Sequence, residues 1–538
     1  MRRLVILALI LVAALVGAPL VFADEAGQNK ADPRQQTAVT LAKETTRITE
    51  PLRKDGYPDY VAALDRQAKQ GVTPQNNVAV VLFQELGPGE VSEEMSAAFF
   101  RGLGIDPVPA DGEYLVSFSE FLEQKGIEAQ RRAEIEDNFY DSLDSQAPWS
   151  QEDFPLVAEW LATYEQHLDR IVRGSKRSRY YSPMMLDEET PHLLIAVLLP
   201  SLSHFRTASR PLHARAMLRL GEGNIDDAWS DLLACHRLAR LVGQGPFLID
   251  VLVSSAIERP AIRGIAGLAH HGKLTAEQVK KFRAQLDALP KAPRVADVMD
   301  QGERYMFLDC GCAMARDGLY HLTSTLASGD VDVQQTAWGD ILKTLSRQAI
   351  DWDVVLRTGN AGYDRLVGVA RAKDHSERAK RMQKLEDDIV AMGDRSKRGL
   401  LGSPLLLLAG EKGKHKLSRM VGEMLLTLLM PGLTSVMQSE HQTLTLAHME
   451  NMSLDLAAYR AQRGNYPERL EDLIPDVRAA LPVDEFTGAH FRYRRDETDY
   501  VLYSVGSNGK DDEGREHGED DDHPGADDIV LETTRIVK

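Results

Sequence analysis

The stretch LAAYRAQRGNYPERLEDL, residues 456–473, marks a change in the character of this 538-residue chain. Its first half continues a helical spacing of apolar residues that runs from about Leu433 to Gly464. After Gly464, the spacing gives way to short segments in which apolar and polar residues alternate, as they do in β-strands. The sequence therefore predicts a long helix followed by a small sheet.

Three segments after this point have strand character: AHFRYRR (489–495), DYVLYSV (499–505) and DIVLET (528–533). In the first, Phe491 and Tyr493 share one face while Arg492 and Arg494 share the other. A long helix packed on three antiparallel strands makes an α+β unit over residues 433–538. Its core is expected to contain Tyr459, Tyr466, Leu470, Phe491, Tyr493 and Tyr503.

Residues 24–432 have a different pattern, with apolar residues three and four positions apart over most of their length. Thr275 and Gln278 form a capping box at the start of one such helix, which ends at Pro290. No alternation of strands and helices appears, which argues against a nucleotide-binding α/β domain. The predicted fold is a mostly α-helical array, possibly of two subdomains, followed by the small α+β domain.

One helical segment, His213–Val242, predicts two antiparallel helices joined at Gly221–Asn224. The run from Gly223 to Ala228 resembles the second half of a tetratricopeptide unit, although Arg219 stands where that family usually has an aromatic residue. Repeat arrays need at least about three units to bury a continuous core, and no second copy is evident. A helical hairpin within a non-repetitive domain is the alternative.

The N-terminus has the pattern of an export signal. Arg2 and Arg3 precede an apolar run, and Val21 and Ala23 occupy the positions that a signal peptidase requires before Asp24. We expect residues 1–23 to be removed from an exported protein, periplasmic or secreted, that keeps no stable transmembrane span. The alternative is an uncleaved N-terminal helix that anchors the chain.

Composition excludes some classes of function. The formal net charge of −18 argues against nucleic-acid binding, which needs basic surface. The three cysteines, Cys235, Cys310 and Cys312, do not form a disulfide framework. Cys310 and Cys312 lie in a helical apolar stretch, where small buried thiols are the commoner explanation than metal binding or a disulfide.

Between Gly509 and Asp528 the chain carries ten acidic residues against one Lys and one Arg. Such a segment is either a solvated disordered tail or a loop folded around a cation. Calcium binds six to eight hard oxygen ligands, and its charge would remove the repulsion among the acids. The spacing of an EF-hand does not fit.

The last ninety or so residues resemble the C-terminal globular domain of the major pseudopilin of type II secretion. The resemblance rests on a set of motifs in the right order: LAAYRAQRGNYPERLEDL, Pro482–Gly488, Phe491–Tyr493, Tyr503–Gly506 and an acidic loop before Asp528. It implies a helix followed by a three-stranded sheet, with calcium bound in the loop between the last two strands.

The resemblance also implies a ligand set. Asn508 stands where the family usually has Asp, Asp528 precedes the last strand, and the carbonyl of Val505 is the main-chain ligand. Another family acid falls on Ala526, so Asp527, Asp511 or Asp512 would replace it. The candidate calcium ligands are Val505, Asn508, Asp511, Asp512, Asp527 and Asp528.

The chain departs from that family at its other end. A pseudopilin begins with a short leader and a hydrophobic helix continuous with the globular domain, whereas some four hundred mainly helical residues precede the domain here. The resemblance therefore implies a fold and an ion, without membership of the secretion machine.

No sequence motif of a known catalytic class is present. His441 and His448 share a helical face with Glu440 and Glu450 nearby, a set that could bind zinc, although solvated or capping histidines explain it more simply. We expect a structural or protein-interaction role in the cell envelope, with other envelope proteins as partners. The alternative is an envelope hydrolase whose active site lies in the helical body.

Overall fold

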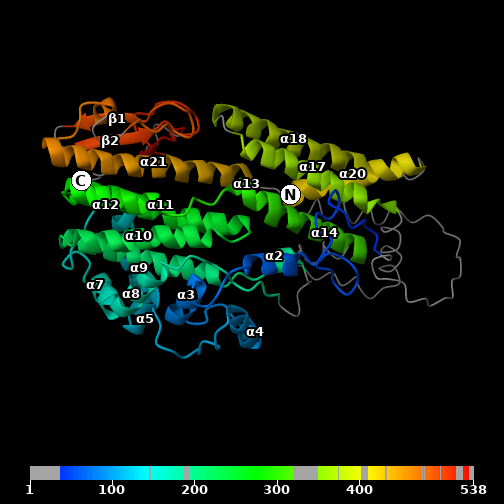
Figure 1. Ribbon diagram of the computed structural model, residues 1–538, viewed down its shortest axis with the longest axis horizontal. Helices are drawn as coiled ribbons and strands as arrows, with labels where there is room; N and C mark the ends of the chain where they lie inside the picture. Colours follow the sequence, from blue (N-terminus) through cyan, green and yellow to red (C-terminus); the bar gives the residue numbers. More distant parts are fainter. Residues whose placement is uncertain are drawn as a thin grey trace.

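The computed structural model describes residues 37–144, 147–186, 193–318, 349–372, 375–401, 410–429, 433–474, 477, 479–496, 499–516 and 525–531. Most of these residues are helical, and one three-stranded antiparallel sheet lies near the C-terminus (Figure 1). The predicted fold class is confirmed at this level. The expected signal segment, residues 1–23, lies outside the described residues.

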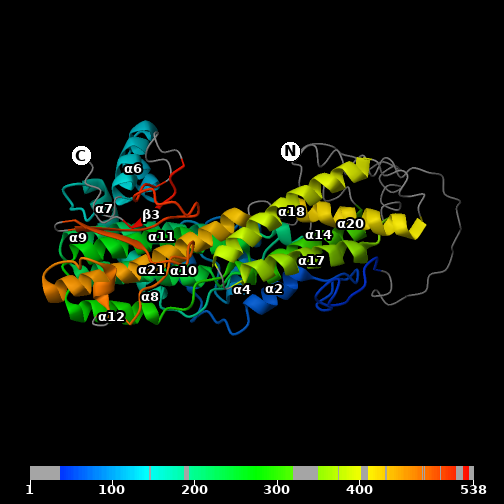
Figure 2. The ribbon, with the colours of Figure 1, turned by 90° about the horizontal axis from the view of Figure 1, so that it is seen from above.

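The first group of helices surrounds a core rich in phenylalanine and tryptophan. It comprises α2 (Tyr60–Ala68), α3 (Val78–Leu86), α4 (Glu93–Leu103), α5 (Phe118–Gln124), α6 (Ala129–Asp144), α7 (Pro155–Thr163), α8 (Glu165–Gly174), α9 (Ser201–Gly221), α10 (Ile225–Val242), α11 (Leu248–His271) and α12 (Ala276–Asp287). The buried side chains of α2 belong mainly to the core of a second group of helices, described below. The long helices α9, α10 and α11 are stacked in adjacent layers, and α6 projects from their side (Figures 1 and 2).

The predicted hairpin at residues 213–242 is confirmed as α9 and α10. Gly223 has a φ of 82°, which suits glycine, and makes the turn between them. Ala228 is fully buried, so the two helices approach closely. Arg219 donates to the buried carboxylate of Asp231 at 2.8 Å, which explains a charged residue where the tetratricopeptide pattern has an aromatic one.

The second group of helices carries a core of its own. It comprises the short turn η2 (Leu194–Ala196), α13 (Val295–Val298), the π-helical turn η3 (Met299–Glu303), α14 (Arg304–Asp317), α17 (Trp352–Ala370), α18 (His375–Leu401) and α20 (Gly410–Leu429). Cys310 and Cys312 are free, buried thiols in α14. Their place in the core agrees with the packing role predicted for them.

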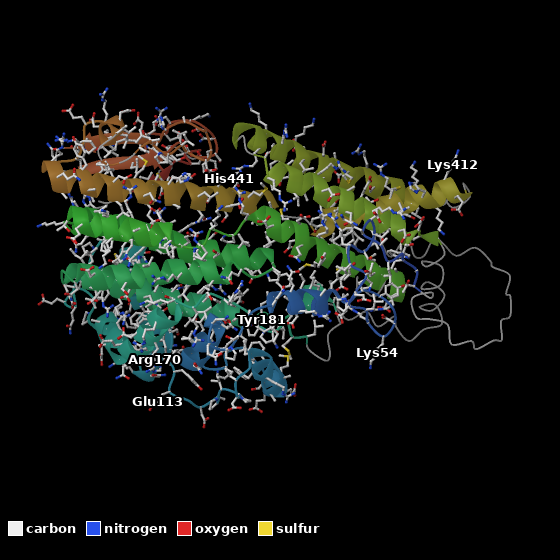
Figure 3. All side chains as sticks on the ribbon, viewed as in Figure 1. Lys54, Glu113, Arg170, Tyr181, Lys412 and His441 are labelled. Carbon is white, nitrogen blue, oxygen red and sulfur yellow. The ribbon has the colours of Figure 1, made fainter. Side chains whose placement is uncertain are left out.

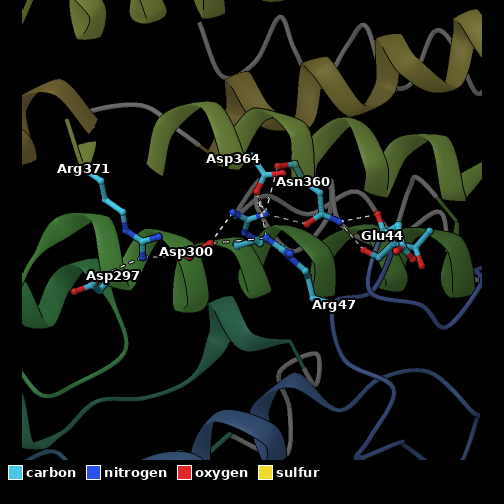
Figure 4. A network of polar contacts seen from close by, with 9 residues as sticks. Glu44, Arg47, Asp297, Asp300, Asn360, Asp364 and Arg371 are labelled. Atoms are coloured by element: carbon cyan, nitrogen blue, oxygen red, sulfur yellow. Dashed lines mark hydrogen bonds and ion pairs between the residues drawn. The ribbon is translucent and has the colours of Figure 1, made fainter. Parts of the chain in front are cut away.

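A buried arginine organises this second group. Arg304 is fully buried and donates to Asp300 and to Asp364, each at 2.7 Å. Asn360, beside Asp364 on α17, donates to the backbone carbonyl of Thr45, so the network also holds the N-terminal segment (Figure 4). A guanidinium removed from water is costly unless it is paired. We therefore assign this network to the stability of the helical body.

Helix α21 (Leu433–Arg463) begins and ends where the sequence predicted and is about 46 Å long at 1.5 Å per residue. Met437 lies in the second core, Leu454 in the first, and Met449 in a third core under the sheet. The helix packs along α11 and α12 as well as against the strands. It therefore joins the C-terminal unit to both groups of helices.

The sheet has the order β1 (Arg492–Asp496), β2 (Asp499–Ser504) and β3 (Ile529–Leu531), all antiparallel. A short helical turn, η4 (Leu470–Leu473), connects α21 to this sheet. Leu502 pairs with Leu531, and both point into the third core with Phe491 and with Ile262 of α11.

Five of the six residues predicted for the core of this unit belong to it. Tyr466, Leu470 and Phe491 are buried there, and Tyr459 and Tyr493 pack against its edge. Tyr503 does not share this core. It lies on the opposite face of β2 from Leu502, because side chains alternate along a strand, and it is buried under the acidic loop instead.

None of the helices in the described ranges has the length and apolar character needed to cross a bilayer. The apolar stretch Met424–Met437 falls largely in α20 and α21, where Met424 and Met437 are core residues. Its Pro431 and Gly432 lie outside the described residues.

Candidate functional site

The acidic loop connects β2 to β3 and covers the outer face of the sheet. Its described parts are residues 505–516 and 525–528. A Cβ on Gly514 would lie 3.7 Å from the side chains of Tyr503 and Val501, so the loop rests on these residues. The hydroxyl of Tyr503 donates to Asp511 Oδ1 at 2.9 Å. At least this part of the segment is folded, as the cation-binding interpretation requires.

The turn at Pro482–Gly488 supports the beginning of the loop. Asp484 is buried and accepts a hydrogen bond from the hydroxyl of Ser504 at 2.8 Å. The same hydroxyl accepts from the backbone N–H of Gly506 at 3.1 Å. Gly506 has a φ of 63°, and a Cβ there would collide with the backbone of Asp527. This glycine therefore allows the two ends of the loop to meet.

Three carboxylates converge where those ends meet. Oxygen atoms of Asp512, Asp527 and Asp528 all lie within 4.8 Å of one another. The side chain of Asp527 accepts at Oδ2 from the backbone N–H of Ser507 and of Asn508, both at 3.0 Å. Asp528 accepts at Oδ2 from the N–H of Asp512 at 3.1 Å and of Gly514 at 2.7 Å. Backbone N–H groups thus fix the carboxylates of Asp527 and Asp528 in place.

The second oxygen of two of these carboxylates has no hydrogen-bond donor. Oδ1 of Asp527 and Oδ1 of Asp528 are both buried and without a partner among the described residues. Asp528 is only 3% exposed, and buried carboxylate oxygens without a donor are costly. A hard cation is one partner that such oxygen atoms accept, so the chemistry of these carboxylates fits part of a calcium site, which needs six to eight oxygen ligands.

The electrostatics of the cluster point the same way. Burial raises the pKa of Asp528 to about 6, and the charges of Asp512 and Asp511 contribute to the rise, against a hydrogen bond from Gly514 that lowers it. In the absence of a cation the cluster is therefore repulsive when fully ionised. A divalent ion would remove that repulsion.

The other predicted ligands lie nearby but are oriented differently. Asn508 directs its amide nitrogen toward Asp512 Oδ2, at 3.2 Å, so it presents a donor and not an oxygen to the cluster. Asp511 accepts a hydrogen bond from Tyr503 and pairs with Arg492, whose Nε lies 3.2 Å from its Oδ2, so its carboxylate is engaged away from the cluster. Val505 is a buried residue directly after β2. The carboxylate set that the geometry favours is Asp512, Asp527 and Asp528.

Sequence reasoning missed the residue that ties this loop to the helical body. Glu516 Oε1 accepts from Arg263 of α11 at 3.0 Å and from the N–H of Val530 in β3 at 3.3 Å. One more acid in a run of ten gives no sign of this role, because its partner lies 253 positions away.

The histidines and glutamates considered as a zinc set on α21 do not converge. Glu440 accepts from the N–H of Val295 at 2.9 Å, and the ring of His441 packs against Phe486. Figure 3 shows His441 near the end of α21 that approaches α17 and α18. His448 Nδ1 is bonded to the carbonyl of Val483 at 3.1 Å. The zinc interpretation has no geometric support here.

Glu450, the last of that set, belongs to a buried charged cluster instead. Its Oε1 lies 2.9 Å from Nε2 of His236 on α10, and Glu258 Oε1 on α11 lies 3.6 Å from Nδ1. Burial lowers the pKa of His236, but attraction by Glu450 and Glu258 outweighs it and raises the value to about 9. Arg240 lies 2.5 Å from Glu258. The ion pairs of this cluster connect α10, α11 and α21, and His236, Glu258 and Glu450 are all buried.

Cavities of a few hundred cubic ångströms lie in the described part of the helical body. One of about 420 Å³ lies between the two helical groups and is bordered by Arg179, Gly245, Arg294 and Gln301. Two others, of about 440 and 270 Å³, lie beside α9. Among their described lining residues, none of the three combines a histidine with a carboxylate.

Comparison of the chain with protein-family models, with curated proteins and with solved structures returned no match.

Proposed function

We propose that this chain is an exported protein of the cell envelope with a structural or protein-interaction role, whose C-terminal pseudopilin-like domain is stabilised by calcium. The observation that carries the proposal is the convergence of Asp512, Asp527 and Asp528, with two buried carboxylate oxygens that lack a donor. The order of a long helix, three antiparallel strands and an acidic loop between the last two supports the pseudopilin-like part.

In this proposal the ion has a structural task. Asp512 lies on the strand β2 side of the loop, whereas Asp527 and Asp528 directly precede β3. An ion bound by all three would hold the two ends of the loop together and thereby fix β3 on the sheet. Through Glu516 and Arg263 the same loop contacts α11. Calcium binding would therefore also strengthen the attachment of the domain to the helical body.

The arrangement of side chains in the helical body favours a binding role in the envelope over a role as a hydrolase. Its buried histidine cluster has no access to solvent, since His236 is 1% exposed, and the described cavities do not bring histidine and carboxylate together. A general acid or base must reach its substrate within hydrogen-bond distance. The partners we propose are other proteins of the envelope.

Thermal unfolding of the full chain tests the calcium proposal. A ligand that binds only the folded form stabilises it by about 2.7 kcal/mol at a hundredfold excess over its Kd. The melting temperature should therefore be higher in millimolar calcium than in chelator, and magnesium should have a smaller effect because it prefers a compact octahedral site. Superimposable melting curves in calcium and chelator would contradict the proposal.

A further inference from the structure

We propose that the cleft between α6, α9 and α11 binds a small organic anion with an apolar portion. Two cavities, of about 440 and 270 Å³, open on either side of the same three residues, Tyr140, Arg206 and Arg210. Pockets of a few hundred cubic ångströms with an apolar lining and a few polar groups are typical of small-molecule sites. Helix α6, which carries Tyr140, projects from the helical layers (Figure 2).

The anion preference comes from the two arginines. Arg206 and Arg210 are one turn apart on α9, hence on one face, and both are exposed. Among the described residues neither forms an ion pair, and the guanidinium of Arg210 lies 5.8 Å from the ring centre of Tyr140. In a chain with a net charge of −18, two neighbouring arginines that have no acidic partner in the described part of the chain are available for a ligand. Guanidinium groups bind carboxylate and phosphate through paired hydrogen bonds.

The larger cavity supplies the apolar part. It is lined by Leu143 of α6 and by Ile257 and Ala261 of α11. His213 also lines it and is 7% exposed, and its Nε2 has no hydrogen-bond partner among the described residues. The lining therefore combines an aliphatic surface with a neutral polar group, since burial lowers the pKa of His213 to about 4.

A proline lies within each of the two long helices beside the cleft. Pro211 in α9 has no N–H to donate to the carbonyl of Thr207, four residues earlier, and Pro260 in α11 has none for Ala256. Thr207 lines the smaller cavity and Ala256 the larger.

The test uses the full chain with octanoate and octyl phosphate as probes and octanol as the uncharged control, measured by isothermal titration calorimetry. The carboxylate of octanoate and the phosphate of octyl phosphate can both bind guanidinium groups, and the two titrations show which of them binds with the lower Kd. We expect one anion to bind per chain and octanol to bind at least about tenfold more weakly, because a charge-assisted hydrogen bond is worth a tenfold change or more in Kd.

Three variants complete the test. Arg206→Gln and Arg210→Gln should each weaken anion binding about tenfold or more, whereas Arg101→Gln, which changes an exposed arginine of α4 outside the cleft, should not. Ala256→Phe places a ring at an exposed position in the larger cavity and should abolish binding without changing the melting temperature. Equal binding of octanol, unchanged binding in both arginine variants, or no binding of either anion would overturn the proposal. The calcium-dependent melting is unaffected by any of these outcomes.

Discussion

Nε2 of His236 on α10 lies 2.9 Å from Oε1 of Glu450 on α21, and both side chains are buried. The two residues are 214 positions apart in the chain, and their contact attaches the central helix of the C-terminal domain to the helical body. Removing one member of a buried ion pair leaves the other charge uncompensated, which commonly costs about 3–5 kcal/mol.

Glu450→Ala should therefore lower the free energy of unfolding by about 3–5 kcal/mol at neutral pH. The control is Glu113→Ala, which removes an exposed carboxylate and should change stability by less than about 0.5 kcal/mol. Urea unfolding of the full chain measures both. Equal stability of the two variants would contradict a stabilising role for the His236–Glu450 ion pair.

The same pair predicts a pH dependence. The pKa of His236 is raised from about 6.5 to about 9, so the folded protein keeps a proton that the unfolded chain releases between these values. This stabilisation is fully present below about pH 6.5 and is lost as the pH rises through about 9. The difference in unfolding free energy between the wild type and Glu450→Ala should shrink over that range. A difference that stays constant from pH 6 to pH 10 would contradict it.

The α9–α10 hairpin depends on a second buried charge. Asp231 is fully buried and accepts from Arg215 at 2.7 Å and from Arg219 at 2.8 Å. Asp231→Ala should cost about 3–5 kcal/mol, because Arg215 and Arg219 both lose their buried partner, and Arg215 keeps only the carboxylate of Asp169 at 2.9 Å. Asp226→Ala on the same helix breaks an exposed pair with Lys281 and should cost about 1 kcal/mol or less. Chemical denaturation of both variants measures their free energies of unfolding. Equal losses in Asp231→Ala and Asp226→Ala would contradict the importance of the buried charge.

Export gives a prediction about the mature protein. The n-region, the apolar run and the small residue at Ala23 predict cleavage between Ala23 and Asp24. Mass spectrometry of the protein from its native host should find a mature chain that begins at Asp24. A membrane-bound chain that retains Met1 would favour the anchor instead.

Local patterns predicted the elements of the structure well. The ends of α21, the three strands, the hairpin at Gly223 and the capping box of Thr275 with Gln278 all follow from periodicity and turn chemistry within a few residues. Each of these features depends on neighbours in the chain, which the sequence displays directly.

Contacts between distant segments could not be predicted in the same way. Nothing local to Glu450 indicates His236, and nothing local to Glu516 indicates Arg263. Tyr503 was assigned to the wrong face because β2 is apolar on both faces, and only the acidic loop explains why its outer face is covered.

The candidate metal site depends both on local sequence patterns and on the three-dimensional path of the chain. The composition of the loop and the resemblance predict its position, and calcium as its ion stays a prediction. Which acids turn inward depends on the path of the loop, where Glu513 has a φ of 62° and Gly514 a φ of 83°. That path directs Asp512 toward Asp528 and Asp511 toward Tyr503, although the two acids are adjacent in the chain.

The most direct test of the account is calorimetric titration of calcium into the full chain and into two loop variants. Asp528→Asn keeps an oxygen for the N–H groups of Asp512 and Gly514 but removes the charge, whereas Glu513→Gln removes an exposed charge of the same loop outside the three-carboxylate cluster. We predict one saturable calcium ion per chain for the wild type and for Glu513→Gln, and none for Asp528→Asn. Saturable binding that persists in Asp528→Asn, or its absence from the wild type, would contradict the calcium site.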